Sequence, residues 1–187
     1  MSVSYAICRQ TLQSSPPPPS EELAPPQWFA VQIRYRFEKK VAAQLRDKGC
    51  EIYLPLRTER HTWSDRQKSV TVPLFPGYAF VRMGRSVAER RRVMETAGLI
   101  GFVSFGRMIA PIPLKQIEYL QLLLKENTPF SPYPFIRAGQ RVRVRGGSLD
   151  GLEGIFLQCD KGKLVISIDT IQRALAIEIR GYDLELI

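Results

Sequence analysis

The residue types that perform acid–base, nucleophilic or metal chemistry are sparse in this chain. It contains one histidine, His61, and three widely separated cysteines, Cys8, Cys50 and Cys159. The sequence offers His61 no partner of the kind that a catalytic triad requires. Zinc sites use closely spaced cysteine and histidine pairs, and an odd number of distant cysteines does not form a disulfide framework. The sequence therefore predicts no enzyme, no catalytic residue, no metal site and no cofactor.

Basic residues interleaved with aromatic ones are the strongest chemical signal. Tyr35 and Phe37 are flanked by four basic residues, namely Arg34, Arg36, Lys39 and Lys40. A second basic cluster consists of Arg90, Arg91 and Arg92. Such side chains bind phosphates without sequence preference, and exposed bases stack on aromatic rings. We expect both clusters to bind nucleic acid through Arg34, Arg36, Lys39, Lys40, Arg90 and Arg91. A solvated helix face is the alternative, and one arginine of the second cluster should lie inward along its aliphatic stem.

The net charge of +9 is confined to the middle of the chain. The number of basic residues (Lys and Arg) minus the number of acidic residues (Asp and Glu) gives 1 − 2 = −1 for residues 1–27. The same difference is 18 − 9 = +9 for residues 28–127 and 8 − 7 = +1 for residues 128–187. A localised basic field suits a polyanion. No apolar run is long enough to span a membrane, and the N-terminus lacks a signal pattern. We expect a cytoplasmic protein that binds nucleic acid and no membrane.

Composition divides the chain into four segments. Residues 1–26 are rich in proline, serine and glutamate and predict a disordered arm. Residues 27–127 predict the order strand–helix–strand–strand–strand–helix–strand–helix, an α+β sandwich with helices on an antiparallel sheet. Residues 128–137 carry three prolines and predict a linker. Residues 138–187 contain five short apolar runs separated by glycines and aspartates, which predict a small five-stranded barrel.

Three strings in residues 27–127 resemble the N-terminal domain of the NusG transcription factors. They are Trp28-Phe29-Ala30-Val31, the run from Pro73 through Phe75-Pro76-Gly77-Tyr78 to Val81, and the run from Gly98 to Val103. Residues 138–155, with Leu149-Asp150-Gly151-Leu152, resemble a KOW module. Residues 102–106 and 171–179 are similar to the specialised antiterminator branch typified by RfaH and UpxY. Two domain signatures in this order indicate an elongation or antitermination factor that suppresses pausing or termination.

The resemblance also implies partners. In the family, the region around Phe75, Pro76, Gly77, Tyr78 and Phe102 helps form an apolar groove for the clamp helices of the largest RNA polymerase subunit. An aromatic side chain there could instead be core, as we expect for Phe80.

Further contacts are implied for the basic surface and for the hairpin. The basic surface faces upstream DNA and the displaced non-template strand in the family, and His61 lies in a hairpin that can reach polymerase or DNA. An exposed loop without a partner is the alternative for His61.

Family KOW domains dock on the ribosomal protein NusE or on Rho through exposed apolar residues. Leu149, Leu152 and Ile171 are the candidates here, unless the barrel core hides them. The β-branched and alternating residues of 164–168 and 174–179 favour strands over a helical alternative. We therefore expect a monomer whose C-terminal barrel does not refold. A competing hypothesis is an RNA-binding KOW protein of the ribosome or of RNA processing, which leaves residues 27–127 unexplained.

Overall fold

The structure is a computed structural model that describes residues 25–63, 66–106, 108–126, 128–136, 139–157, 162–179 and 181–187. The expected disordered arm lies outside these residues except for its last two positions. The N-terminal elements are β1 (Gln27–Ile33), α1 (Glu38–Asp47), β2 (Glu51–Tyr53), β3 (Leu56–Trp63), β4 (Arg66–Pro73), β5 (Tyr78–Met83), α2 (Val87–Met94), β6 (Leu99–Phe102), β7 (Ser104–Phe105), β8 (Met108–Ile109), β9 (Pro111–Ile112) and α3 (Leu114–Lys125). The C-terminal elements are β10 (Phe130–Tyr133), β11 (Gln140–Arg145), the short 3-10 helix η2 (Gly147–Leu149), β12 (Glu153–Leu157), β13 (Lys163–Ile168), the 3-10 helix η3 (Asp169–Ile171), β14 (Arg173–Glu178) and β15 (Asp183–Leu186).

Strand β1 is the centre of the N-terminal sheet. It pairs antiparallel with β5, β6 and β9, and the described residues give the order β2-β5-β1-β6. Side chains alternate across a strand, so Phe29 and Val31 enter one core cluster while Trp28 and Ala30 enter another. Different elements therefore pack against the two faces of this sheet.

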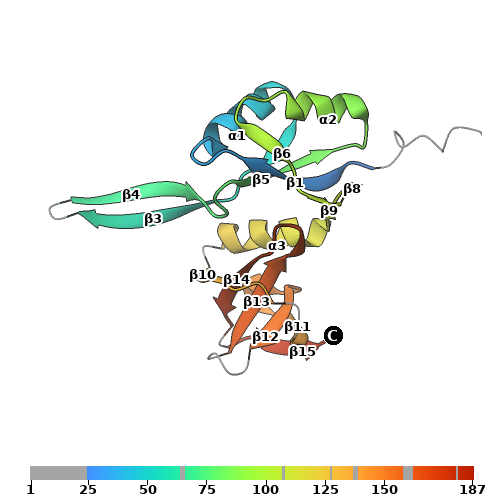
Figure 1. The fold of residues 1–187 in the computed structure, drawn as a ribbon. Helices are drawn as coiled ribbons and strands as arrows, with labels where there is room; N and C mark the ends of the chain where they lie inside the picture. Colours follow the sequence, from blue (N-terminus) through green and yellow to red (C-terminus); the bar gives the residue numbers. More distant parts are fainter. Residues whose placement is uncertain are drawn as a thin grey trace, which may run out of the picture.

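Helices α1 and α2 cover the first face (Figure 1). Val41, Ala42 and Leu45 of α1 are buried there together with Val93 of α2. The Nζ atom of Lys48, just after α1, donates to the carbonyl oxygens of Arg92 and Glu95 at 3.3 and 3.1 Å. A cation at the last carbonyls of a helix is favourable, and this contact joins the ends of the two helices.

Strands β3 and β4 form a two-stranded ribbon that projects from the body (Figure 1). The sequence predicts a polar tip over residues 60–69, but the pairing continues through Arg60↔Ser69 and His61↔Lys68. The hairpin is as expected, but its strands extend further into the polar segment than the sequence indicates, because residues on a ribbon that projects from the body need not be apolar.

The C-terminal half, called the β-domain below (residues 128–187), is a six-stranded antiparallel sheet. Its described order is β10-β14-β13-β12-β11-β15. The mixed α+β class is confirmed, and the C-terminal half is β-rich as expected. The five expected strands are β11 to β15; β10 is a sixth, formed from the predicted linker. Among the described residues, the outer strands β10 and β15 do not pair to close a barrel.

Helix α3 lies between the N-terminal sheet and the β-domain (Figure 1). Its buried residues are Ile117, Leu120 and Leu123, which share one core cluster with side chains from both halves. The helical spacing of Leu114, Ile117 and Leu120 predicts that all three face inward. Leu114 is instead 53% exposed, because it is the first residue of the helix.

Candidate functional site

The turn between β4 and β5 is fixed from three sides. The Tyr78 amide donates to the Phe75 carbonyl at 3.1 Å, and the Ile33 amide donates to the Gly77 carbonyl at 2.8 Å. The Gly77 amide donates to the buried carboxylate oxygen Oε1 of Glu38 at 2.9 Å. Gly77 has φ of +80°, a conformation that glycine adopts without steric cost. The backbone between the two candidate aromatics is therefore held rigidly.

Four aromatic rings form a continuous row on the sheet face opposite α1. Phe75 contacts Phe80 edge-on with centroids 6.3 Å apart, Phe80 stacks on Tyr53 at 6.3 Å, and Tyr53 meets Trp28 edge-on at 6.5 Å. Such geometries are the preferred ones for aromatic pairs. Burial raises the pKa of the Tyr53 hydroxyl to about 12, so Tyr53 stays neutral at physiological pH. We call Trp28, Tyr53, Phe75 and Phe80 the aromatic row.

Sequence reasoning selected only part of this site. It named Phe75 as a binding residue and missed Tyr53. The sequence places Tyr53 in a predicted strand, which does not show what it lies next to. The pairing Tyr53↔Phe80 places it beside the other rings. Of the turn residues, Phe75 is buried, Pro76 is exposed, and Tyr78 is half-buried beside the same cluster.

Phe102 does not lie with the other candidates. It packs edge-on against Phe29 at 6.5 Å, in the cluster beneath α1. Its neighbour Val103 packs instead against the cluster that contains Phe75. Adjacent strand residues point to opposite faces, so a motif that spans both cannot place both in one groove.

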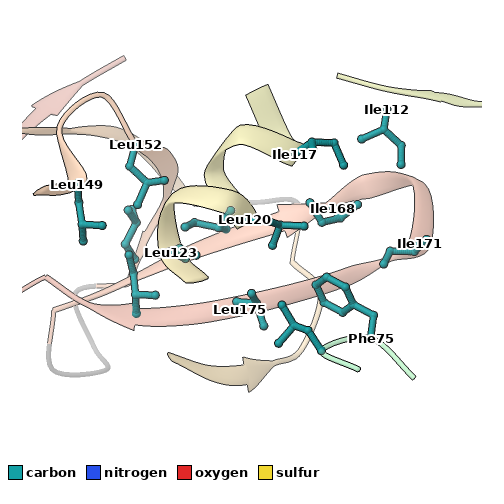
Figure 2. Packing of buried hydrophobic residues seen from close by; sticks show 14 of the residues in the cluster. Phe75, Ile112, Ile117, Leu120, Leu123, Leu149, Leu152, Ile168, Ile171 and Leu175 are labelled. Atoms are coloured by element: carbon teal, nitrogen blue, oxygen red, sulfur yellow. The ribbon is translucent and has the colours of Figure 1, made fainter. Parts of the chain in front are cut away.

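The β-domain and α3 cover the aromatic row. Phe75 is 4% exposed and lies in one cluster with Ile171 and Leu175 of the β-domain (Figure 2). Leu149, Leu152 and Ile171, expected as exposed partner-binding residues, are 1, 0 and 6% exposed. The alternative, that the core hides them, therefore applies in this arrangement, because all three belong to the core cluster shared by α3 and the β-domain.

Polar contacts join α3 to the β-domain at the edge of this core. Gln116 Nε2 donates to Asp169 Oδ2 at 3.3 Å, and the Tyr119 hydroxyl donates to the Gly151 carbonyl at 3.4 Å. Lys115 Nζ lies 3.5 Å from Glu153 Oε1. The bond from Arg143 holds the pKa of Glu153 below its usual value, and Lys115 acts in the same direction. These contacts lie at the solvent edge and add specificity more than free energy.

The first basic cluster is exposed around the start of α1. Arg34, Arg36, Lys39 and Lys40 are all exposed, as is Tyr35 at 67%. The Arg34 guanidinium and the Lys40 ammonium both lie 5.8 Å from the Phe37 ring centroid, and Arg36 lies 5.5 Å from that of Tyr35. Lys39 Nζ donates to the Thr71 carbonyl at 2.6 Å, so this lysine is partly committed to the fold.

The three arginines of the second basic cluster differ in exposure. Arg90 of α2 is half-buried, whereas Arg91 and Arg92 are exposed. Arg91 also pairs with Glu95 at 2.7 Å. Both α1, which carries Lys39 and Lys40, and α2, which carries the second cluster, cover the same sheet face. His61 belongs to β3, but the prediction for its side chain lies outside the described residues.

Other chemistry has little support in the part of the chain that the structure describes. No group of three or more His, Cys, Asp and Glu side chains there could hold a metal ion. None of the helices found in the described ranges is long and apolar enough to cross a membrane.

Comparison with known proteins agrees with this architecture. The family model described as transcription termination factor nusG matches residues 26–123, more than half of the 187 residues. The chain is 28% identical over 169 residues to the transcription termination/antitermination protein NusG of Lactococcus lactis, covering 84% of this chain and 91% of that one. It is 27% identical over 183 residues to the NusG protein of Staphylococcus carnosus, covering 89% and 98%.

A solved structure shows the same fold. The structure, which addresses domain interaction in Thermotoga maritima NusG, is 19% identical and has a TM-score of 0.50, covering 84% of this chain and 96% of that one. With the family model matched across the sheet, the turn and all but the end of α3, this chain belongs to the NusG family of transcription termination/antitermination factors.

Proposed function

We propose that this chain is a cytoplasmic elongation and antitermination factor that binds RNA polymerase through the aromatic row and the turn at residues 75–78. Its partner there would be the clamp helices of the largest subunit, and its action would be to suppress pausing or termination. The observation that carries the proposal is the row itself. Four rings on one sheet face, with a rigid turn at one end, make a surface on which an amphipathic helix can lay its apolar side.

The basic cluster around α1 supplies the second contact in this proposal. Upstream duplex or the displaced non-template strand would bind Arg34, Arg36 and Lys40, with Tyr35 as an exposed ring for stacking. This surface borders the turn at residues 75–78, because Glu38 between Arg36 and Lys39 accepts the Gly77 amide, so DNA and polymerase would bind adjoining surfaces of the N-terminal half.

The covered row sets a condition on polymerase binding. Phe75 is in the interdomain core, so a helix cannot reach it until the β-domain moves aside. The same movement would expose Leu149, Leu152 and Ile171, the residues that we propose for contact with NusE or Rho. Both binding surfaces are therefore hidden together and would be released together.

Co-purification from a lysate tests the proposal. The tagged full-length chain should recover core RNA polymerase and not ribosomes. Substituting Phe75→Ser should weaken recovery by an amount on the order of 1–3 kcal/mol, as for other aromatic anchors. Phe105→Ser is the matched control, because Phe105 is 54% exposed and belongs to β7, outside the row. Recovery of ribosomes in place of polymerase would support the RNA-binding alternative.

A further inference from the structure

We propose that β10 is a detachable strap: paired with β14 it holds the β-domain over the aromatic row, and the β-domain leaves the row only when β10 leaves β14. This inference concerns the chain alone and does not depend on what binds the row.

Strand β10 is an addition to the edge of the β-domain. It pairs only with β14 among the described strands, through Phe130↔Ile177, Ser131↔Ala176, Pro132↔Leu175 and Tyr133↔Ala174. The remaining five strands pair with one another without it. Ser131 and Pro132 are exposed, and proline is tolerated in sheets at edges. A four-residue edge strand can therefore detach while the rest of the sheet stays paired.

The two ends of β10 are anchored in different clusters. Phe130 packs against the interdomain core, which also contains Phe75 and Leu120. Tyr133 packs against the second cluster of the β-domain, which contains Val165 and other strand residues. When the β-domain separates from α3, Phe130 is left with neighbours on one side only. The docking of the β-domain on α3 and the pairing of β10 with β14 therefore stabilise each other.

The residues just before β10 are hydrogen-bonded to the end of α3. The Glu126 amide donates to the Leu122 carbonyl at 3.0 Å, and the Thr128 amide donates to the Leu123 carbonyl at 3.2 Å. Both Glu126 and Thr128 are thus bonded to the last turn of α3. Any separation of the two halves must be supplied by residues after Thr128.

Chain length then decides how far the β-domain can move. From Lys125 to Phe130 the chain has five steps, which reach about 18 Å when fully extended. From Lys125 to Gln140, where β11 begins, it has fifteen steps and a reach of about 50 Å. With β10 paired, this short tether keeps the β-domain beside α3 and the row. With β10 released, the tether is nearly three times longer, and the local concentration of the β-domain at the row falls.

Interdomain distances measured between spin labels test the strap. Labels are placed at Val87→Cys on α2 and Leu186→Cys on β15, because these residues are 79 and 65% exposed. The three native cysteines are replaced by serine. The first variant, Phe130→Gly with Pro132→Gly and Tyr133→Ser, removes both anchors and keeps the tether length. Pro132→Gly alone is its matched control, because it leaves the anchors in place.

The starting protein and the control should show a narrow, short distance distribution, and the triple variant a broad, longer one. Far-ultraviolet circular dichroism should show that the triple variant keeps its strands. A triple variant with the same narrow distribution as the control would overturn the proposal.

A disulfide lock supplies the opposite test. Leu120→Ala should weaken the interdomain core and populate long distances. For this test the labels are attached to p-acetylphenylalanine at positions 87 and 186, so that the thiols belong only to Ser131→Cys and Ala176→Cys, which face each other across β10 and β14. The oxidised protein should return to the short distance, and the reduced protein should not. A locked, oxidised protein that opens as far as the reduced one would show that β10 does not restrain the β-domain. Neither test needs polymerase, so the outcome is independent of the proposed function.

Discussion

One buried side chain, that of Glu38, holds the turn between β4 and β5 in place. Glu38 is 3% exposed, yet its carboxylate accepts the Gly77 amide from the turn that carries Phe75 and Tyr78. A buried polar group is costly without a partner, so this contact ties the start of α1 to the turn. Glu38 is a positioning residue, and its effect on any partner would act through the turn.

Removal of that carboxylate should destabilise the fold. We expect Glu38→Ala to lower the free energy of unfolding by about 1–3 kcal/mol, because the Gly77 amide would be left without its buried acceptor. Glu38→Gln keeps an oxygen at the same place and should recover part of this free energy. Chemical denaturation of both variants measures this. Glu118→Ala is the control, since Glu118 is exposed on α3; equal effects of Glu38→Ala and Glu118→Ala would contradict the assignment.

Tyr53 should make the protein sensitive to alkali. Its pKa is about 12 in the folded chain, against about 10 for an unfolded tyrosine. The folded state thus holds the proton to higher pH, so this stabilising contribution is complete below pH 10 and disappears as pH rises to 12. The unfolding midpoint in urea should fall less between about pH 9 and pH 11.5 for Tyr53→Phe than for the unchanged chain. Tyr35→Phe, at an exposed ring, should behave as the unchanged chain does.

Close backbone packing decides which elements tolerate change. In β12, a Cβ on Gly154 would lie 2.6 Å from the Val165 carbonyl oxygen and 2.9 Å from a Leu164 side-chain atom. A backbone neighbour at that distance cannot move aside without disturbing the β12–β13 pairing. In β6, by contrast, a Cβ on Gly101 would meet nothing within 4 Å.

These two glycines give a matched pair of variants. Gly154→Ala should lower the thermal midpoint and cost on the order of 1–3 kcal/mol, as overpacking does elsewhere. Gly101→Ala should be neutral or slightly stabilising, because it only restricts the unfolded chain. Calorimetry of the intact protein measures both, and a Gly154→Ala protein as stable as the Gly101→Ala protein would show that the β-sheet relaxes more easily than its geometry implies.

At the scale of the whole molecule, the first basic cluster is exposed and the aromatic row is covered. The N-terminal half carries the charge excess of +9 in residues 28–127, and α1 and α2 cover the side away from the β-domain (Figure 1). The closed arrangement therefore hides the aromatic row but leaves the basic cluster open. Nucleic acid should bind the intact chain without any opening.

We expect the full-length protein to bind single-stranded DNA with strong salt dependence. Replacing Arg34 and Arg36 by alanine should weaken binding uniformly across sequences and reduce the logarithmic salt slope by about 0.7 for each phosphate that is no longer neutralised. Fluorescence anisotropy at several salt concentrations gives both quantities. Arg173→Ala is the control, being exposed on β14 in the β-domain. Equal weakening by the control substitution would mean that binding follows net charge and not this cluster.

Local patterns in the sequence were sufficient for the element types of the fold. The compact apolar run that begins at Trp28 determines a strand with two buried faces, because successive strand side chains point to opposite faces and both sets here are apolar. The spacing of Val41 and Leu45 determines the buried side of α1, and the β-branched runs of the C-terminal half determine strands. The basic cluster was also visible, because consecutive long basic side chains are rarely buried without partners, although Glu38 among them is buried.

Only the tertiary structure decided what those faces meet. Phe102 and Phe75 have similar sequence signals but lie on opposite faces of one sheet, which depends on register. Residues 130–133 contain a proline that predicts a linker, yet the open edge of β14 turns them into a strand. Leu149, Leu152 and Ile171 are apolar whether the β-domain is docked or free, so the sequence does not say whether they are exposed. In the structure they are buried because α3 packs on the β-domain. Strand and helix formation depend on near neighbours in sequence, whereas these outcomes depend on which apolar surfaces remain uncovered after the elements have formed.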